Sequence, residues 1–457
     1  MKIQSILIYS FVASATLLGS ACRKYVEIEQ NDRRTLKTTD DYRYLLNNKG
    51  NFETSYLLPL VTSDNIAREV ASTAASVWGG STQLAYIWSA QFFTGDQQDG
   101  GWNNLYKHIY VANEILDGVM DSQNGTPAQK LAVAAEARVH RAFAYYSLAN
   151  QYAPVYDPTK AESQQGLPLL LTVDLFQNLS RVSLARIYEQ IITDLTTAIN
   201  NLPNYPSFNY HPSKVSAYAL MSRVYLTMRN FEEAGRYADL ALALDPTIYN
   251  LEDFTRDETF PRLIDDKEVL LSKTSAGYMI GPLNPELISL YKEGDLRLKL
   301  FIDNEPGTYK GYIYKKPVFN SSGNYYNASY VGLSSPEVLL NRAEVYARQN
   351  NAAKVVELLN LLRKKRFSAD KYVALTTADV NSDLLQSVID ERRREFVGTD
   401  LRWYDMRRLT LDGGYFKTIT RTFNGQTYSL NAGSPRLVYP INERVLSFNP
   451  EIGQNPR

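Results

Sequence analysis

The chain contains 457 residues, 44% of them hydrophobic, which is enough to bury a large core and to form two or three substructures. Its 49 Lys and Arg residues equal its 49 Asp and Glu residues, so the net charge gives no indication of a nucleic-acid partner. Tyrosine is abundant, at 33 residues, and we interpret this mainly as core packing. A sugar- or peptide-binding surface would use the same broad ring and outward hydroxyl.

The N-terminal residues 1–21 are predicted to be a secretory signal peptide. Lys2 precedes an apolar run that ends in three small residues, and this run is too short and too interrupted to be a convincing membrane-spanning helix. The next residue, Cys22, is the only cysteine in the chain. The stretch LLGSA followed by Cys22 resembles the lipobox of bacterial lipoproteins, in which this cysteine is acylated. The alternative is an ordinary secretory signal followed by an incidental cysteine. With no second cysteine, the exported chain folds without disulfides.

The polar stretch RKYVEIEQNDRRT after Cys22 is predicted to be a tether. After it, apolar residues at helical spacing predict a series of helices. Thr126 and Pro127 are typical of an N-cap and a first-turn proline, and Ser183 is a second predicted N-cap. The predicted helical segments are 40–47, 102–120, 127–152, 184–203, 216–246, 336–366 and 388–408, the last with a turn at Gly398.

The segment Ser216–Pro246 predicts two short helices that meet at residues 229–230. Bulky, small and aromatic residues fall where a 34-residue tetratricopeptide repeat places them. These residues are Tyr218, Ser222, Tyr225, Phe231, Ala234 and Ala241. One such pair cannot bury its own apolar face, so neighbouring helices must stack on it. We therefore expect a mainly α fold, with a scaffold of tetratricopeptide-like helix pairs, long irregular loops and a few short strands.

Two stretches depart from the helical pattern. Residues 62–101 are rich in Ser, Thr, Gly and Asp with aromatic residues among them, and such a long irregular segment favours a functional role. Residues 247–334 contain many tyrosines and the possible strands EVLLSK and GYIYKKPVF.

Catalytic and metal-binding motifs are lacking. His108, His140 and His211 lie in separate segments without ligand spacing, so we expect no metal and no cofactor. A glycosidase needs only two carboxylates at a set separation, so that alternative stays open. The charge run 391–395, continued through residues 402–408, favours a structural network of ion pairs, with i,i+4 pairing, over an anion-binding site.

Several blocks together resemble the SusD/RagB family. They are the lipobox, WNNLYKHIYVANEIL, AEARVHRAFAYYSLANQYAPV, the tetratricopeptide pair, SSPEVLLNRAEVYAR, ERRREFVGTDLRWYDMRRL and the closing PIN…NP. The resemblance implies an outer-membrane lipoprotein of Bacteroidetes-type bacteria, anchored by Cys22 and facing the exterior. Such proteins are not enzymes; they capture oligosaccharides, or in some members peptides, as the lid of a SusC-type TonB-dependent transporter. The expected organisation is a SusD-like N-terminal region at 22–220 and a RagB/SusD C-terminal region at 221–457, with the tyrosine-rich insertion 247–334.

The ligand residues of this family come from loops, where flat aromatic rings stack on the apolar faces of sugars. Trp78 is the first choice because Gly and Ser flank it; ordinary packing is the alternative for every candidate. The candidate ligand residues are Trp78, Tyr86, Trp88, Tyr278, Tyr309, Tyr312 and Tyr326. Trp102 and Trp403 are expected in the core. The alternative function is that of a helical-repeat adaptor that binds only protein partners.

Overall fold

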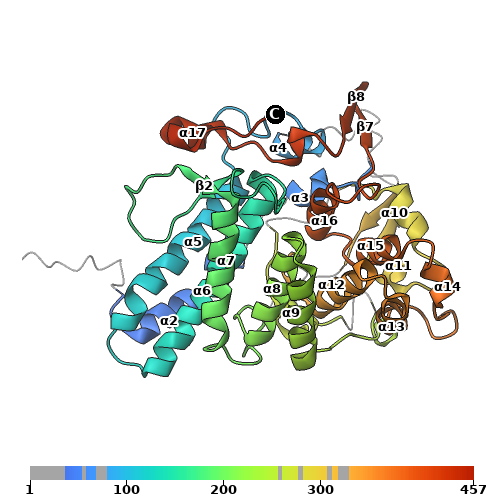
Figure 1. The fold of residues 1–457 in the computed structure, drawn as a ribbon, viewed down its shortest axis with the longest axis horizontal. Coiled ribbons are helices and arrows are strands. Elements are labelled where there is room, and N and C mark those ends of the chain that lie inside the picture. Colours follow the sequence, from blue (N-terminus) through green and yellow to red (C-terminus); the bar gives the residue numbers. More distant parts are fainter. Residues whose placement is uncertain are drawn as a thin grey trace, which may run out of the picture. The chain divides into compact units, whose positions relative to one another are not determined.

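Helices of four to 26 residues follow one another along the described chain in this computed structural model (Figure 1). The structure describes residues 36–53, 58–67, 80–255, 260–275, 281–305, 311–316 and 329–457. The predicted signal peptide and Cys22 lie outside these residues. All of the described helices and strands belong to one compact unit, Thr38–Arg457.

The described helices are α2 (Thr39–Asn47), α3 (Leu58–Thr62), α4 (Ser81–Tyr86), α5 (Gly100–Gly118), α6 (Pro127–Tyr152), α7 (Leu184–Ile199), α8 (Lys214–Thr227), α9 (Phe231–Leu244), α10 (Pro285–Leu290), α11 (Leu296–Leu300), α12 (Ser335–Arg348), α13 (Ala352–Arg363), α14 (Thr377–Val380), α15 (Leu384–Glu395), α16 (Leu401–Leu409) and α17 (Glu443–Phe448). The strands form antiparallel pairs: β1 (Gln165–Pro168) with β2 (Arg181–Ser183), β3 (Val269–Leu271) with β6 (Leu333–Ser334), β4 (Ile302–Glu305) with β5 (Gly311–Tyr314), and β7 (Ile419–Phe423) with β8 (Gln426–Leu430).

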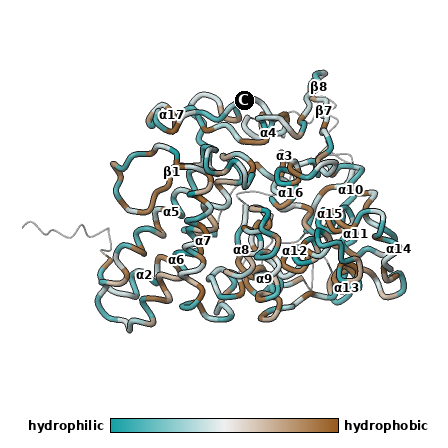
Figure 2. Tube along the Cα trace, in the orientation of Figure 1, coloured by the Kyte–Doolittle hydropathy of each residue, from teal (hydrophilic) through white to brown (hydrophobic). Residues whose placement is uncertain are grey.

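The helices form a serial stack. Helix α6 packs between α5 and α7, α8 packs between α7 and α9, and α12 packs against α9, α13 and α15. Hydrophobic and hydrophilic residues alternate along these helices, as a stack with one face buried requires (Figure 2). The mainly α fold class with few short strands is confirmed. The predicted division at residues 220–221 stays a prediction, and it falls within α8.

The predicted helix starts are confirmed at both N-caps. The Thr126 hydroxyl accepts from the amide of Gln129 at 3.3 Å, and the Gln129 side chain accepts in return from the Thr126 amide at 2.7 Å, with Pro127 in the first turn. The Ser183 hydroxyl accepts from the amide of Arg186 at 3.3 Å. A capping hydroxyl of this kind contributes about 1 kcal/mol to helix stability.

The tetratricopeptide-like pair is α8 with α9. The chain reverses at Arg229, which has a φ of 64°, and Asn230 caps the second helix. The hydroxyl of Ser222 donates to the carbonyl of Ala234 at 3.0 Å, and the ring of Tyr225 stacks on that of Tyr237 at 5.6 Å. The small residue therefore permits close approach of the helices, and the aromatic residue fills the space beside it, as the repeat pattern predicts.

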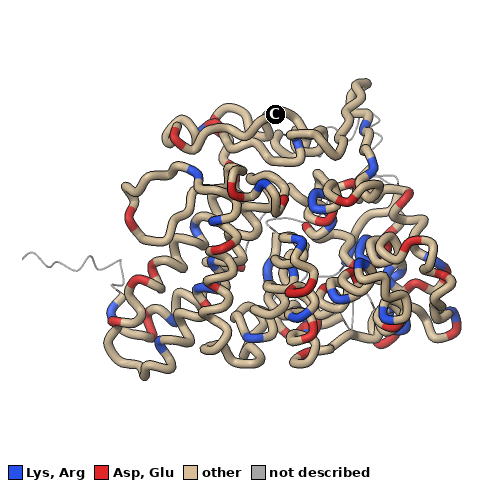
Figure 3. The backbone as a smooth tube through the Cα atoms, viewed as in Figure 1, with Lys and Arg blue, Asp and Glu red and all other residues tan. Residues whose placement is uncertain are grey.

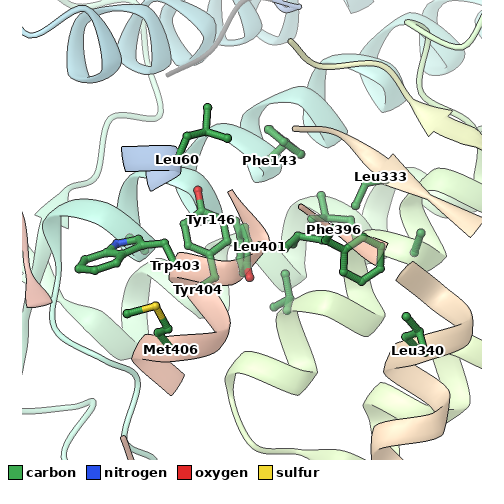
Figure 4. Packing of buried hydrophobic residues seen from close by; sticks show 14 of the residues in the cluster. Leu60, Phe143, Tyr146, Leu333, Leu340, Phe396, Leu401, Trp403, Tyr404 and Met406 are labelled. Carbon is green, nitrogen blue, oxygen red and sulfur yellow. The ribbon is translucent and has the colours of Figure 1, made fainter. Parts of the chain in front are cut away.

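The core continues from the helix stack to α16. Figure 4 shows Trp403 and Tyr404 of α16 near Tyr146 of α6 and Leu60 of α3. Trp403 is fully buried and Trp102 is 6% exposed, so their predicted placement in the core is confirmed. None of the described helices is both long and apolar enough to cross a membrane.

The charge run on α15 and α16 forms a buried network of ion pairs. Figure 3 shows both signs of charge interspersed around α12, α13 and α15. The fully buried Glu391 carboxylate pairs with Arg297 of α11 at 2.8 Å and with Arg394 at 2.5 Å. Asp405 pairs with Arg392 at 2.8 Å. The structural network is confirmed, but most partners come from other helices instead of from i,i+4 positions, because both helices are buried on several sides.

The irregular stretch 62–101 contains more helix than the sequence predicts. Helix α4 lies within it, and α5 begins at Gly100, where the carboxylate of Asp99 accepts from the amides of Gly101 and Trp102. Helix α4 spans six residues, too few for a hydrophobic period to be recognised.

Candidate functional site

A groove of about 510 Å³ lies between α10, α15, α16 and the segment that leads into β7. Two partly buried aromatic side chains, Tyr415 and Phe416, line one part of it. The Tyr415 hydroxyl donates to the carboxylate of Asp383 at 2.9 Å, which fixes the orientation of that ring. The polar lining includes Asp64, Asn284, Gln386, Asp390, Arg393 and Arg402.

A two-point ion pair forms the floor of the groove. Arg402 donates from Nε to Oδ1 of Asp64 at 2.7 Å and from Nη2 to Oδ2 at 2.6 Å. Burial alone would raise the pKa of Asp64, but the guanidinium groups of Arg402 and Arg393 outweigh it and hold that pKa well below its usual range. Asp64 is therefore ionised at neutral pH.

The backbone around Asp64 is fixed from two further elements. Arg393 of α15 donates to the side-chain oxygen of Asn65 at 3.0 Å and to the carbonyl of Asp64 at 3.3 Å. Asn284, at the start of α10, donates from its side chain to the same carbonyl at 2.9 Å. The floor is thus assembled from segments more than 200 residues apart in the sequence, and its donors and acceptors are held in place before any ligand binds.

Arg421 of β7 supports this floor from behind. Its guanidinium lies between the rings of Tyr86, at 4.0 Å, and Trp88, at 4.2 Å. It donates to the carbonyls of Tyr86 and Ser63, so it joins the hairpin, α4 and the segment before Asp64. Desolvation lowers the pKa of Arg421 to about 10.

This arrangement corrects the interpretation of two candidate ligand residues. Tyr86 and Trp88 are each 1% exposed, and the indole of Trp88 donates to the carbonyl of Thr62 at 3.0 Å. Their rings cover Arg421, so neither has a free face that could stack on a sugar. Their place in a stretch rich in Ser, Thr, Gly and Asp suggested an exposed loop, but Arg421, distant in the sequence, packs against both rings.

Tyr312 is the described candidate that retains an exposed ring, with 36% of its surface accessible. It lies on β5, opposite Asn304. Its carbonyl accepts from the amide of Leu283 at 2.6 Å, directly beside Asn284 of the groove. Tyr312 therefore lies close to the groove. Trp78, Tyr278, Tyr309 and Tyr326 lie outside the described residues.

Described residues that border the segments of these four candidates are paired through backbone hydrogen bonds. The amide of Ala67 donates to the carbonyl of Pro282 at 3.2 Å, next to the contact between Leu283 and Tyr312. The amide of Ser275 donates to the carbonyl of Ser329 at 2.8 Å. The segments that begin or end at these flanks are 68–79, 276–280, 306–310 and 317–328.

The described residues contain no group of three or more His, Cys, Asp and Glu side chains arranged to hold a metal ion. His140 instead lies 3.0 Å from Nζ of the buried Lys273, which also donates to the carbonyl of Phe52. Desolvation lowers the pKa of Lys273 to about 7. No motif in the sequence indicates this buried pair.

Two family models match the chain. One is described as starch-binding and associating with the outer membrane, and it matches residues 34–226. The other is described as the SusD family, and it matches residues 303–457. The chain belongs to the SusD/RagB family.

A curated relative of this SusD/RagB chain is SusD-like protein P2 of Formosa agariphila, which is 23% identical over 378 residues, or 69% of this chain and 72% of that protein. A SusD superfamily protein from Bacteroides thetaiotaomicron has a similar structure, with a TM-score of 0.74, 20% identity and coverage of 92% of this chain and 100% of that one. A laminarin-binding SusD-like protein has a TM-score of 0.68, 19% identity and coverage of 92% and 99%. These structural likenesses show a shared fold.

Proposed function

We propose that this protein captures an oligosaccharide, without catalysis, and delivers it to a SusC-type TonB-dependent transporter for which it acts as a lid. The observation that carries the proposal is a groove with a preassembled polar floor and aromatic walls in a chain of the SusD/RagB family. Family membership supports the transport partner, and the groove supports the ligand.

The chemistry of the groove suits a ligand rich in hydroxyl groups. Sugar hydroxyls both donate and accept, so they need amide and carboxylate partners, and Asn284, Gln386 and Asp390 supply these. Sugar rings also have apolar faces, which pack on flat aromatic side chains such as Phe416. Tyr312 extends the aromatic surface beside the groove. We further propose that Trp78, Tyr278, Tyr309 and Tyr326 contribute to binding. This proposal is supported by the pairing of Ala67 with Pro282, near the ends of two of their segments, beside Leu283 and Tyr312.

Binding without hydrolysis agrees with the state of the carboxylate at the floor. A glycosidase needs a carboxylic acid with a raised pKa beside a second carboxylate. Asp64 has the opposite property, because Arg402 and Arg393 hold its pKa low. Its two oxygens are also occupied by the guanidinium of Arg402. Asp64 is therefore unsuited to protonate a leaving group.

A lipid on Cys22 would anchor the protein to the exterior face of the outer membrane in this proposal. The test is metabolic labelling with a palmitate analogue, together with digestion of intact cells by an added protease. Label on the native chain, its absence from Cys22→Ala, and cleavage in intact cells would support the proposal. If the chain is labelled but is not cleaved in intact cells, the protein is anchored at the periplasmic face instead of the exterior face.

Calorimetric titration tests the binding function directly. The chain from Tyr25 onward is titrated with neutral and acidic oligosaccharides and with a peptide mixture. We expect saturable binding to a glycan, weakened by about two- to tenfold in Phe416→Ala, which is the range for losing one aromatic contact. Phe448→Ala is the matched control, because that ring is 75% exposed on α17, away from the groove residues. Binding of peptides alone would identify a peptide-capturing member, and binding of neither class would contradict capture at this groove.

Pull-down from outer-membrane extracts tests the transporter partner. The full-length chain with an affinity tag is recovered after mild solubilisation, and the proteins that accompany it are identified by mass spectrometry. We expect a TonB-dependent barrel protein in near-stoichiometric amount. Its absence under conditions that retain the lipid anchor would contradict the lid role and leave glycan capture intact.

A further inference from the structure

Charged side chains of both signs line the groove, three acidic and three basic. They are Asp64, Glu286, Asp390, Arg393, Arg402 and Lys417. Which of these charges remains available to a ligand determines the class of sugar that the groove can accept.

Both arginines are already engaged and largely buried. The side chain of Arg402 is 12% exposed, and its guanidinium makes the two-point contact with Asp64. The side chain of Arg393 is 9% exposed, and it donates hydrogen bonds to the side chain of Asn65 and to the carbonyl of Asp64. An anionic sugar would have to compete with the Asp64 carboxylate for these groups. Breaking a buried pair of this kind is costly because it leaves a buried charge without its partner, and one sugar carboxylate at the surface does not regain that loss.

The charges that face solvent are mostly negative. Glu286 has 72% of its side chain exposed, and its nearest cationic atom, on Arg393, is 3.9 Å away. Asp390 accepts from the side-chain Nε2 of Gln386 at 2.8 Å, and no described Lys or Arg lies within ion-pair distance of it. Lys417 is the one exposed cation of the lining among the described residues. A site for uronic acids or sulfated sugars would instead present several unpaired cations.

The neighbouring stretches of sequence contain few charges as well. Within 68–79, 276–280, 306–310 and 317–328 the charged residues are Arg68, Glu69 and Lys310, and the other residues are mainly small, amide-bearing or aromatic. The composition of these stretches is thus typical of contacts to hydroxyls and ring faces, and it adds no cationic cluster.

We infer that the groove selects uncharged oligosaccharides and rejects those that carry carboxylate or sulfate groups. This inference rests on the proposed capture function and names its ligand class. Glu286 and Asp390 accept hydrogen bonds from neutral hydroxyls, and the same two carboxylates repel an anionic chain. Because binding of a neutral ligand releases no counterions, its affinity depends little on salt.

The test compares one polysaccharide with its own oxidised derivative. The neutral glycan that binds in calorimetry is oxidised at its primary hydroxyls, so that each CH₂OH becomes a carboxylate while the backbone is unchanged. Both forms are titrated at low and at physiological salt, against the native chain and against the double variant Glu286→Gln, Asp390→Asn. We expect the oxidised form to bind about fivefold more weakly or worse at low salt, since one unscreened contact between like charges costs about 1 kcal/mol.

The double variant separates charge repulsion from lost fit. If charge repulsion weakens binding of the oxidised glycan, the double variant should bind the neutral and oxidised forms with more similar affinities than the native chain does. If the oxidised form binds weakly because it no longer fits the groove, the ratio of the two affinities should be the same in the variant, and that result would overturn the inference. Equal or tighter binding of the oxidised form by the native chain would also overturn it and would leave the capture function standing. If a panel of starch, laminarin, galactomannan, polygalacturonate, alginate and chondroitin sulfate yields no ligand of either kind, the capture function fails and the inference fails with it.

Discussion

The carboxylate of Asp64 and the guanidinium of Arg402 form a two-point ion pair across 338 positions of sequence. Asp64 follows α3 near the beginning of the compact unit, and Arg402 belongs to α16 near its end. Their contact joins the two ends of the fold at the floor of the groove. The proposed binding function and the stability of the fold therefore involve the same pair.

Asp64→Asn tests this pair. The substitution leaves the buried Arg402 without its carboxylate, and we expect the free energy of unfolding at pH 7 to fall by about 3 kcal/mol in urea denaturation. The folded-state pKa of Asp64 is depressed, so its contribution is present above the unfolded pKa of about 4 and is lost as the pH falls below that value. The stability of Asp64→Asn should accordingly approach that of the native chain in acid.

Glu286→Gln is the control for that measurement, because its side chain is 72% exposed. We expect it to change the unfolding free energy by less than about 0.5 kcal/mol. A loss in Asp64→Asn no larger than that of the control would contradict the structural role of the ion pair.

Arg421→Met tests the support behind the floor. The variant keeps an apolar chain between Tyr86 and Trp88 but leaves the carbonyls of Tyr86 and Ser63 without their donor. We expect a loss of about 2–4 kcal/mol and faster hydrogen exchange in α3 and α4 than in α6. Arg186→Met is the matched control, since its side chain is 57% exposed and pairs with Glu189 on the same helix. Uniform acceleration of exchange over all helices would contradict a local role for Arg421.

Lys273→Met tests the buried lysine. Desolvation lowers its folded pKa to about 7, against about 10.4 in the unfolded chain, so between these values the unfolded state binds more protons. Stability should therefore rise with pH through this window, by up to about 1.4 kcal/mol per pH unit, and the variant should lose that slope. His140, whose pKa is lowered by burial and by Lys273, remains neutral throughout. The other titratable groups acting on the pair are Glu53, His108 and His211.

Denaturation between pH 7.5 and 9.5 is the measurement for Lys273→Met. Many tyrosines have a raised folded pKa, so their ionisation in the unfolded chain already lowers stability above about pH 8.5. The tyrosine contribution is common to both proteins, so the slope due to Lys273 is the difference between the native chain and the variant. An equal slope in the native chain and in the variant would show that Lys273 is charged in its buried position.

Local rules were sufficient to predict the scaffold. The helix caps and turns depend on residues only a few positions apart, so short stretches of sequence determine their geometry. Examples are the caps at Thr126 and Ser183, the helix reversal at Arg229–Asn230 and the turn at Gly398. The alternating charges also predicted that this run forms ion pairs, but local rules did not predict its partners on other helices, such as Arg297 for Glu391.

The groove was not predictable, because its floor combines four separate stretches of chain. The sequence around Asp64 has no motif that points to Arg402, and nothing marks Gln386 or Asp390 as neighbours of Tyr415. The search for exposed aromatic residues selected Tyr86 and Trp88 on local composition. Only the fold brings Arg421 between them and removes them from the surface.

Gly398 sets the turn that positions both arginines of the groove, since Arg393 precedes it on α15 and Arg402 follows it on α16. Its φ is 78°, and an added Cβ would clash with the ring of Tyr314 on β5. Gly398→Ala should therefore suffer both backbone strain and overpacking, a loss of about 3 kcal/mol by denaturation. Ligand affinity should fall as well if the turn moves instead of the buried Tyr314 ring, because Arg393 and Arg402 flank the turn and would move with it.

Two glycines near the groove separate these contributions. Gly414 has a φ of 92° with open space around it, so Gly414→Ala should show the strain alone, about 1 kcal/mol. Gly413 has open space and no positive φ, so Gly413→Ala should be close to neutral. If Gly398→Ala proves no more destabilising than Gly414→Ala, contact with Tyr314 does not constrain the turn, and the two arginines must be positioned by their ion pairs alone.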